Sequence, residues 1–84
     1  MNNKSENLQL LKALGRAIQE RRLKLNLSQK QLAEEAGVDR AYISNIEQAK
    51  RNPSLSAMRN LAQGLRTRLS KLISNAERIE DETN

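Results

Sequence analysis

The sequence predicts an all-α fold, a compact five-helix bundle, on three observations. Apolar side chains recur at spacings of three and four residues through most of the chain, which is the period of helices buried along one side. Candidate helix starts and stops, such as Ser28, Gly37 and Pro53, divide these stretches into five segments. One proline, three glycines and a single aromatic residue, Tyr42, leave the aliphatic side chains and methionine to build the core.

The first helix is expected from Leu8 to Leu25. Its apolar stripe consists of Leu11, Leu14, Ile18 and Leu25, with Ala17 beside it. The helix should stop at Asn26, because asparagine tolerates the left-handed backbone conformation found at helix ends. Residues 1–7 contain no apolar pattern, so we expect them to form a disordered N-terminal arm.

Two short helices joined by a tight turn are expected between Ser28 and about Gln48. Ser28 and Gln31 form an S-x-x-Q pattern, in which each side chain bonds the other residue's backbone N–H and caps a helix start. Gly37 can end this helix with a positive φ, and Asp39 can cap the next one. The expected buried residues are Leu32, Ala33 and Ala36 in the first helix, Val38 in the corner, and Ile43 and Ile46 in the second helix.

The second of these helices has a polar, protruding side formed by Arg40, Ala41, Ser44 and Asn45. A buried side and a protruding side of this kind define a helix-turn-helix arrangement, whose second helix can enter the major groove of DNA. A helical hairpin with a purely structural role is the alternative.

The last two helices follow a break at Asn52 and Pro53, since proline cannot continue a helix from the preceding chain. Ser54 can cap a fourth helix that runs to about Leu65, and a fifth is expected from about Arg68 to Ile79. The expected core residues are Leu55, Met58, Leu61, Ala62 and Leu65 in the fourth helix and Leu69, Leu72, Ile73, Ala76 and Ile79 in the fifth. Residues 8–79 thus form the expected domain, and residues 80–84 an acidic, frayed tail.

The absence of cysteine and histidine removes disulfides, thiol nucleophiles and the usual zinc ligands. We therefore expect no cofactor, metal or small-molecule ligand. An enzyme is not expected either, because Glu34 and Glu35 form an exposed helical pair with no pocket-forming residues around them. No long apolar run is present, so we expect a soluble, cytoplasmic protein that does not cross a membrane.

Positive charge is concentrated in the body of the chain. Residues 1–76 carry 14 Lys or Arg and 6 Asp or Glu, a balance of +8, whereas residues 77–84 carry one Arg and four acidic residues. A basic body suits a polyanion such as nucleic acid. Charge alone would equally fit a merely soluble surface, and it favours nucleic acid only in company with the protruding helix.

The helical hairpin and its flanks resemble the lambda-repressor/Cro-type (XRE) helix-turn-helix family. The residues that carry the resemblance, at the family's spacing, are Arg22, Leu27, Ser28, Gln29, Leu32, Ala33, Gly37, Val38, Tyr42, Ile43, Ser44, Ile46, Glu47, Asn52, Pro53, Ser54 and Leu55. With looser matches on both sides, the likeness covers roughly Leu8 to Ile73. The ordered set is specific, although no single residue is.

The resemblance implies a transcriptional regulator that binds double-stranded DNA sequence-specifically, and an ion pair between Arg22 and Glu47. The expected base-reading residues are Arg40, Ala41, Ser44 and Asn45. The expected phosphate-binding residues are Ser28, Gln29, Tyr42, Gln48, Lys50, Arg51 and Asn52. The alternatives are a phosphate contact for Arg40, capping alone for Ser28, a structural role for Tyr42, and simple solvation of Lys50 and Arg51.

Two residues depart from the family pattern. Ala49 stands where a glycine usually ends the recognition helix, and Arg66 replaces a glycine in the turn before the fifth helix. A positive φ at Ala49 would cost roughly 1 kcal/mol, so we expect a differently shaped helix end there and a less predictable turn at Arg66.

A homodimer on a palindromic operator is expected, because one recognition helix covers only a short half-site. The candidate dimer surface is the stripe Leu69, Leu72, Ile73, Ala76 and Ile79, unless all of it packs within the subunit. Residues 38–44 look most like controller proteins of restriction–modification systems. Phage Cro-like repressors and antitoxins with a protein partner are the alternatives, whereas an RNA-binding domain would lack the usual aromatic platform.

Overall fold

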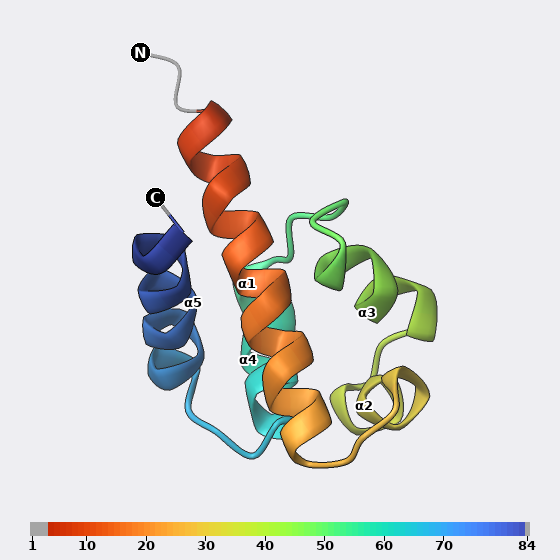
Figure 1. The fold of residues 1–84 in the computed structure, drawn as a ribbon. Coiled ribbons are helices and arrows are strands. Elements are labelled where there is room, and N and C mark those ends of the chain that lie inside the picture. Colours follow the sequence, from red (N-terminus) through yellow and green to blue (C-terminus); the bar gives the residue numbers. More distant parts are fainter. Residues whose placement is uncertain (1–3, 84) are drawn as a thin grey trace.

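Five helices and their connections make up residues 4–83, the part of the chain that the computed structural model describes (Figure 1). No strand is present in this part. The helices are α1 (Lys4–Lys24), α2 (Gln29–Ala36), α3 (Arg40–Glu47), α4 (Leu55–Gly64) and α5 (Leu69–Thr83). The predicted all-α, five-helix fold is therefore confirmed.

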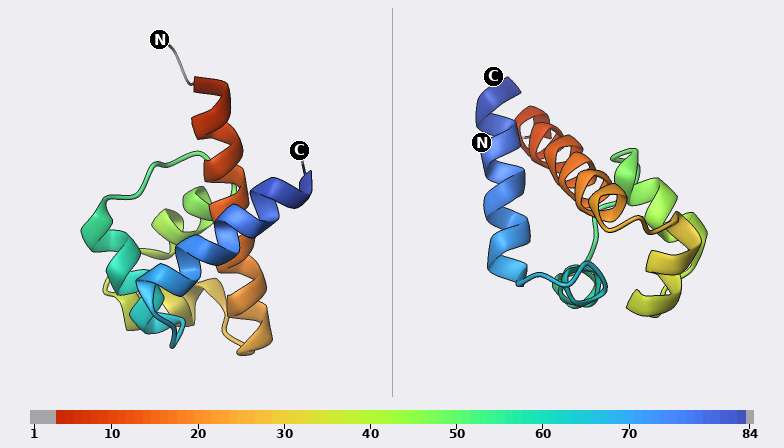
Figure 2. Two further views of the ribbon diagram at one scale, coloured as in Figure 1. Left: turned by 90° about the vertical axis from the view of Figure 1, so that its left-hand side faces the viewer. Right: turned by 60° about the horizontal axis from the view of Figure 1, so that its bottom comes forward.

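The long helix α1 lies in the middle of the molecule, with α5 on one side and the α2–α3 pair on the other (Figures 1 and 2). It packs against α5 and α3, while α4 packs against α2 and α5. The largest fully buried side chains are Ile18, Leu32, Ile43, Ile46, Leu61, Leu65 and Leu72. Each of the five helices contributes to this set from its predicted apolar face, so one core joins all five helices.

Two helices extend beyond their predicted ends. α1 begins at Lys4 instead of Leu8, so residues 4–7 of the expected arm are helical, and residues 1–3 lie outside the described residues. α5 runs to Thr83 instead of Ile79, so residues 80–83 of the expected frayed tail are helical as well. Polar ends carry no apolar pattern, but local bonds stabilise them: Arg78 pairs with Glu82 at 3.1 Å, one turn further on.

Serine side chains cap the starts of α2 and α4. Gln31 N donates to Ser28 Oγ at 3.0 Å, and Ser28 N donates to Gln31 Oε1 at 2.8 Å, which completes the predicted reciprocal cap. Ala57 N donates to Ser54 Oγ at 3.1 Å. Both predicted helix starts are confirmed to within a residue.

The first four helices all end in the same left-handed turn. The residues with positive φ are Asn26 (59°), Gly37 (70°), Ala49 (59°) and Arg66 (57°). In each turn two backbone bonds close over the helix end, as in Lys50 N to Asn45 O at 2.8 Å and Ala49 N to Ile46 O at 3.0 Å. The turns expected at Asn26 and Gly37 are confirmed. The altered helix end expected at Ala49 is wrong, because these two bonds hold the usual turn without glycine.

Leu55, predicted to face the core, is 69% exposed instead. It is the first residue of α4, and the buried position in that first turn is occupied by Ala57. A residue that pattern reasoning passed over, Gly15, lies where α1 meets the end of α3. A Cβ atom there would lie 2.6 Å from the carbonyl oxygen of Glu47, so only glycine lets the two backbones approach this closely.

Replacing Ala49 with glycine should stabilise the protein. Glycine adopts the left-handed conformation without the steric penalty of a Cβ atom, which we expect to raise the free energy of unfolding by about 1 kcal/mol. Urea denaturation checks this value. The matched control is Ala41→Gly on the exposed side of α3, where the same chemical change should lower stability by roughly 0.5–1 kcal/mol. Destabilisation by both substitutions would contradict the strain at Ala49.

Candidate nucleic-acid interface

The outer side of α3 presents the four residues predicted to read bases. Arg40 and Ala41 are exposed and Ser44 and Asn45 are half-buried, whereas Ile43 and Ile46 on the opposite side are buried in the core. The alternation arises because apolar residues at a spacing of three hold one side of the helix inward. All four candidate residues therefore reach the surface, and the two at the start of the helix reach it most fully.

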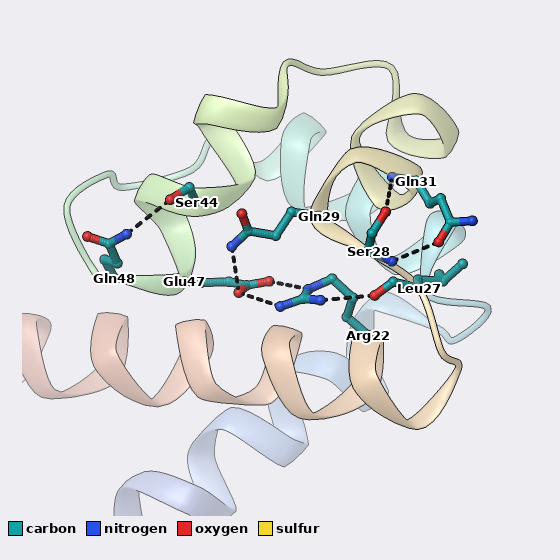
Figure 3. Close-up of polar contacts among 8 residues, drawn as sticks. All are labelled: Arg22, Leu27, Ser28, Gln29, Gln31, Ser44, Glu47 and Gln48. Atoms are coloured by element: carbon teal, nitrogen blue, oxygen red, sulfur yellow. Dashed lines mark hydrogen bonds and ion pairs between the residues drawn. The ribbon is translucent and has the colours of Figure 1, made fainter.

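Ser44 is linked to the residue that follows the helix. The Gln48 Nε2 group donates to Ser44 Oγ at 3.0 Å (Figure 3). A hydroxyl that accepts this bond still has its own hydrogen to donate. The bond therefore orients the Ser44 side chain on the outer face of α3 and leaves it a donor.

An ion pair ties α1 to the last residue of α3. The Arg22 Nε donates to Glu47 Oε2 at 2.7 Å and the second guanidinium nitrogen, Nη2, to Glu47 Oε1 at 3.0 Å (Figure 3). Nη1 also donates to the carbonyl oxygen of Leu27 at 2.9 Å. The two side chains are only 9% and 4% exposed. The ion pair that the family resemblance implies is thus present, in bidentate form.

The pKa of Arg22 is raised above its usual value, chiefly by its hydrogen bonds to Glu47. Desolvation opposes this shift, and the attraction of the carboxylate adds to it. The Arg22 guanidinium therefore stays charged although its side chain is buried.

Gln29, the first residue of α2, joins the same carboxylate. Its Nε2 donates to Glu47 Oε1 at 3.1 Å, so Glu47 binds residues from α1 and α2 together (Figure 3). Gln29 was predicted to bind phosphate. Its amide nitrogen carries a second hydrogen, which this contact leaves for another acceptor.

The other candidate phosphate-binding residues lie beside α3. Lys50, Arg51 and Asn52 are exposed on the connection to α4. The guanidinium carbon of Arg51 lies 4.9 Å from the centroid of the Tyr42 ring, within the range of a cation–π contact. Tyr42 is half-buried and packs against the core. The Tyr42 ring therefore has the structural role that the sequence left open, because it packs on the core and lies under Arg51.

Asp39 does not cap α3 as predicted. Its backbone is extended (φ −77°, ψ 154°), as the position before a helix requires, but its side chain makes no capping hydrogen bond. Ser28 and Ser54 cap their helices from nearly the same backbone conformation. The carboxylate of Asp39 is exposed instead.

Most of the predicted dimer stripe packs within the subunit. Leu72, Ala76 and Ile79 are buried, because α5 lies along α1 and needs this side to cover the core. Those three side chains make their contacts mainly within the subunit. Leu69 is half-buried and packs against the core.

The remaining member, Ile73, is half-buried and lines an apolar groove of about 310 Å³. The other residues lining this groove are Asn7, Leu10, Leu11, Leu14, Asn52, Pro53, Met58 and Ala76. Leu10 and Leu8 are partly exposed at one end of α1. Sequence reasoning missed this groove, although two leucines outside the α1 stripe were a visible signal.

Known proteins resemble this chain in both sequence and structure. A helix-turn-helix family model matches residues 18–72. Control protein C.SmaI of Serratia marcescens is 47% identical over 49 residues, which are 58% of this chain and 58% of that protein. The crystal structure of restriction-modification controller protein C.AhdI from Aeromonas hydrophila has a TM-score of 0.72 at 35% identity, covering 74% of this chain and 94% of that one.

A further solved structure is that of the controller protein C.Esp1396I, a tetramer in complex with its natural 35-base-pair operator. Its TM-score is 0.78 at 27% identity, and the match covers 84% of this chain and 93% of that one.

The chain belongs to the helix-turn-helix family. The predicted likeness to the lambda-repressor/Cro type, and within it to restriction–modification controller proteins, is confirmed. The chain spans only 58% of the length of C.SmaI. In residues 4–83, no helix has the length and apolar character that crossing a membrane would require.

Breaking the buried ion pair on one side should destabilise the fold strongly. Arg22→Met or Glu47→Leu leaves the partner charge buried and unpaired, which we expect to cost about 3–5 kcal/mol of unfolding free energy. The double substitution Arg22→Met with Glu47→Leu removes both charges and should cost far less than the sum of the two single changes. Urea denaturation of the wild-type protein, the two single variants and the double variant gives the coupling free energy between the two side chains.

The exposed pair of Arg16 and Glu20, 3.5 Å apart with both side chains more than half exposed, is the control. Arg16→Ala should change stability by no more than about 0.5 kcal/mol. Single changes at Arg22 and Glu47 as small as this one would show that the buried pair has no structural role.

Proposed function

We propose that this chain is a transcriptional regulator that binds double-stranded DNA in a sequence-specific manner, by placing α3 in the major groove. The observation that carries the proposal is the exposed outer side of α3, on a helix whose inner side is fully buried. Family membership supports it, because the second helix of the motif reads base edges with its first residues.

Base reading is assigned to the four outer residues of α3. Arg40 can donate two hydrogen bonds to guanine O6 and N7, and Ala41 offers a methyl group to a thymine methyl. Ser44, oriented by Gln48, can donate to a base acceptor. Asn45 can bind adenine or, one turn further along, the backbone.

Phosphate binding is assigned to residues on either side of α3. Ser28 and Gln29 lie at the start of α2, where free N–H groups and the helix dipole favour an anion. Lys50, Arg51 and Asn52 follow α3 and add affinity without sequence preference, and Gln48 and the Tyr42 hydroxyl can add further contacts.

A homodimer on an inverted repeat is the expected assembly, with half-sites about 34 Å apart. The apolar groove of α1, α4 and α5, rather than the buried stripe of α5, is the surface that we assign to it. The structurally similar controller protein C.Esp1396I binds its operator as a tetramer, which supports assembly of this chain on DNA. The likeness to C.SmaI and C.AhdI supports a role as a restriction–modification controller rather than an antitoxin or phage repressor, and the adjacent gene would separate these roles.

Selection of bound sequences from random duplex DNA should yield an inverted repeat. Arg40→Ala should relax one base position in each half-site, at a loss of about 1–3 kcal/mol in discrimination. Lys50→Ala should weaken binding to all duplexes alike and lower the slope of log affinity against log salt by about 1. Equal loss on every duplex from Arg40→Ala would assign that residue to phosphate binding instead.

Ultracentrifugation at micromolar concentration should show a dimer. Ile73→Asp should give monomers, because a carboxylate in the apolar groove would be desolvated by the partner subunit. Ser74→Asp, on the exposed side of α5, is the matched control and should leave the dimer intact. A monomeric wild-type protein at high concentration would rule the homodimer out.

A further inference from the structure

Asp39 is an exposed acidic residue at the start of the proposed recognition helix. Its carboxylate makes no capping bond to α3, and it forms no ion pair with any side chain among residues 7–83. Ser28 and Ser54, at the same place before their helices, accept hydrogen bonds from the first turn. The Asp39 carboxylate is therefore a free acceptor beside Arg40.

A carboxylate at this place works against DNA binding in general. The neighbouring Arg40, Lys50 and Arg51 attract phosphates, whereas Asp39 is repelled by them. Contact with DNA would also strip water from the carboxylate, which is unfavourable unless a hydrogen-bond donor replaces that water. Asp39 thus weakens binding to every sequence except those that offer it a donor.

The major groove offers such donors only as exocyclic amino groups. Cytosine presents its N4 amino group as a donor, while guanine O6 and N7 and thymine O4 are acceptors that repel a carboxylate. Adenine has the N6 amino group, but its N7 acceptor lies beside it. Cytosine is therefore the base that best matches an acceptor-only side chain.

We propose that Asp39 is a specificity-determining residue that accepts a hydrogen bond from the N4 amino group of a cytosine. This inference rests on the proposed DNA-binding function. Arg40, the next residue, is matched to guanine. The two side chains together select guanine and cytosine at the same or adjacent base pairs, since Arg40 donates to the guanine acceptors and Asp39 accepts from the cytosine amino group.

The test is selection from random duplex DNA with the wild-type protein and with Asp39→Ala, Asp39→Ser and Asp39→Asn. Wild-type protein should require cytosine at one position of each half-site. Asp39→Ala and Asp39→Ser should both lose that requirement, with a fall in discrimination of roughly 5- to 150-fold. Asp39→Asn should shift the preference toward adenine, which an amide pairs with.

The serine variant separates base reading from helix capping, because serine can cap α3 but carries no charge. Circular dichroism confirms that each variant is folded, and any one folded variant suffices for the comparison. Retention of the cytosine requirement, with affinity raised equally on all duplexes, would overturn the inference and leave Asp39 as a general repulsive charge. If the wild-type protein itself selects no sequence, the proposed function fails instead.

Discussion

The bidentate pair of Arg22 and Glu47 is the interaction on which the arrangement of the helices depends. It joins α1 to the last residue of α3, and Gln29 attaches α2 to the same carboxylate. Burying two charges is unfavourable unless their hydrogen bonds are satisfied, and the Leu27 carbonyl takes up a further guanidinium donor. The pair therefore fixes the angle between the hairpin and the rest of the bundle more than it adds to stability.

Local chemistry explains why most of the fold could be predicted from the sequence. The capping serines, the turns at Asn26 and Gly37, and the buried isoleucines of α3 all depend on residues within one or two turns. The wrong predictions concern positions where the pattern of nearby residues does not decide the structure. Leu55 has the right spacing but begins α4 at the surface, and the turn at Ala49 is retained by backbone bonds that composition does not reveal.

The sequence predicted which residues lie on the exposed side of α3 but not the hydrogen bonds that their side chains make or lack. The exposed side of α3 follows from periodicity, whereas the uncapped carboxylate of Asp39 and the bond between Gln48 and Ser44 depend on side-chain rotamers. The α5 stripe shows the same limit. Spacing identifies the apolar residues of one side, but which of them α1 covers is decided by how the two helices cross, and the groove at Ile73 appears only then.

The close approach at Gly15 restricts how proteins of this shape can diverge. Because the main chain of α1 touches the main chain at the end of α3, no side chain between them can be enlarged or trimmed to shift α3 relative to α1. The distance between α1 and the end of α3 is therefore fixed. Substitutions on the outer side of α3 therefore change the chemistry of that surface and leave the placement of the helix against α1 unchanged.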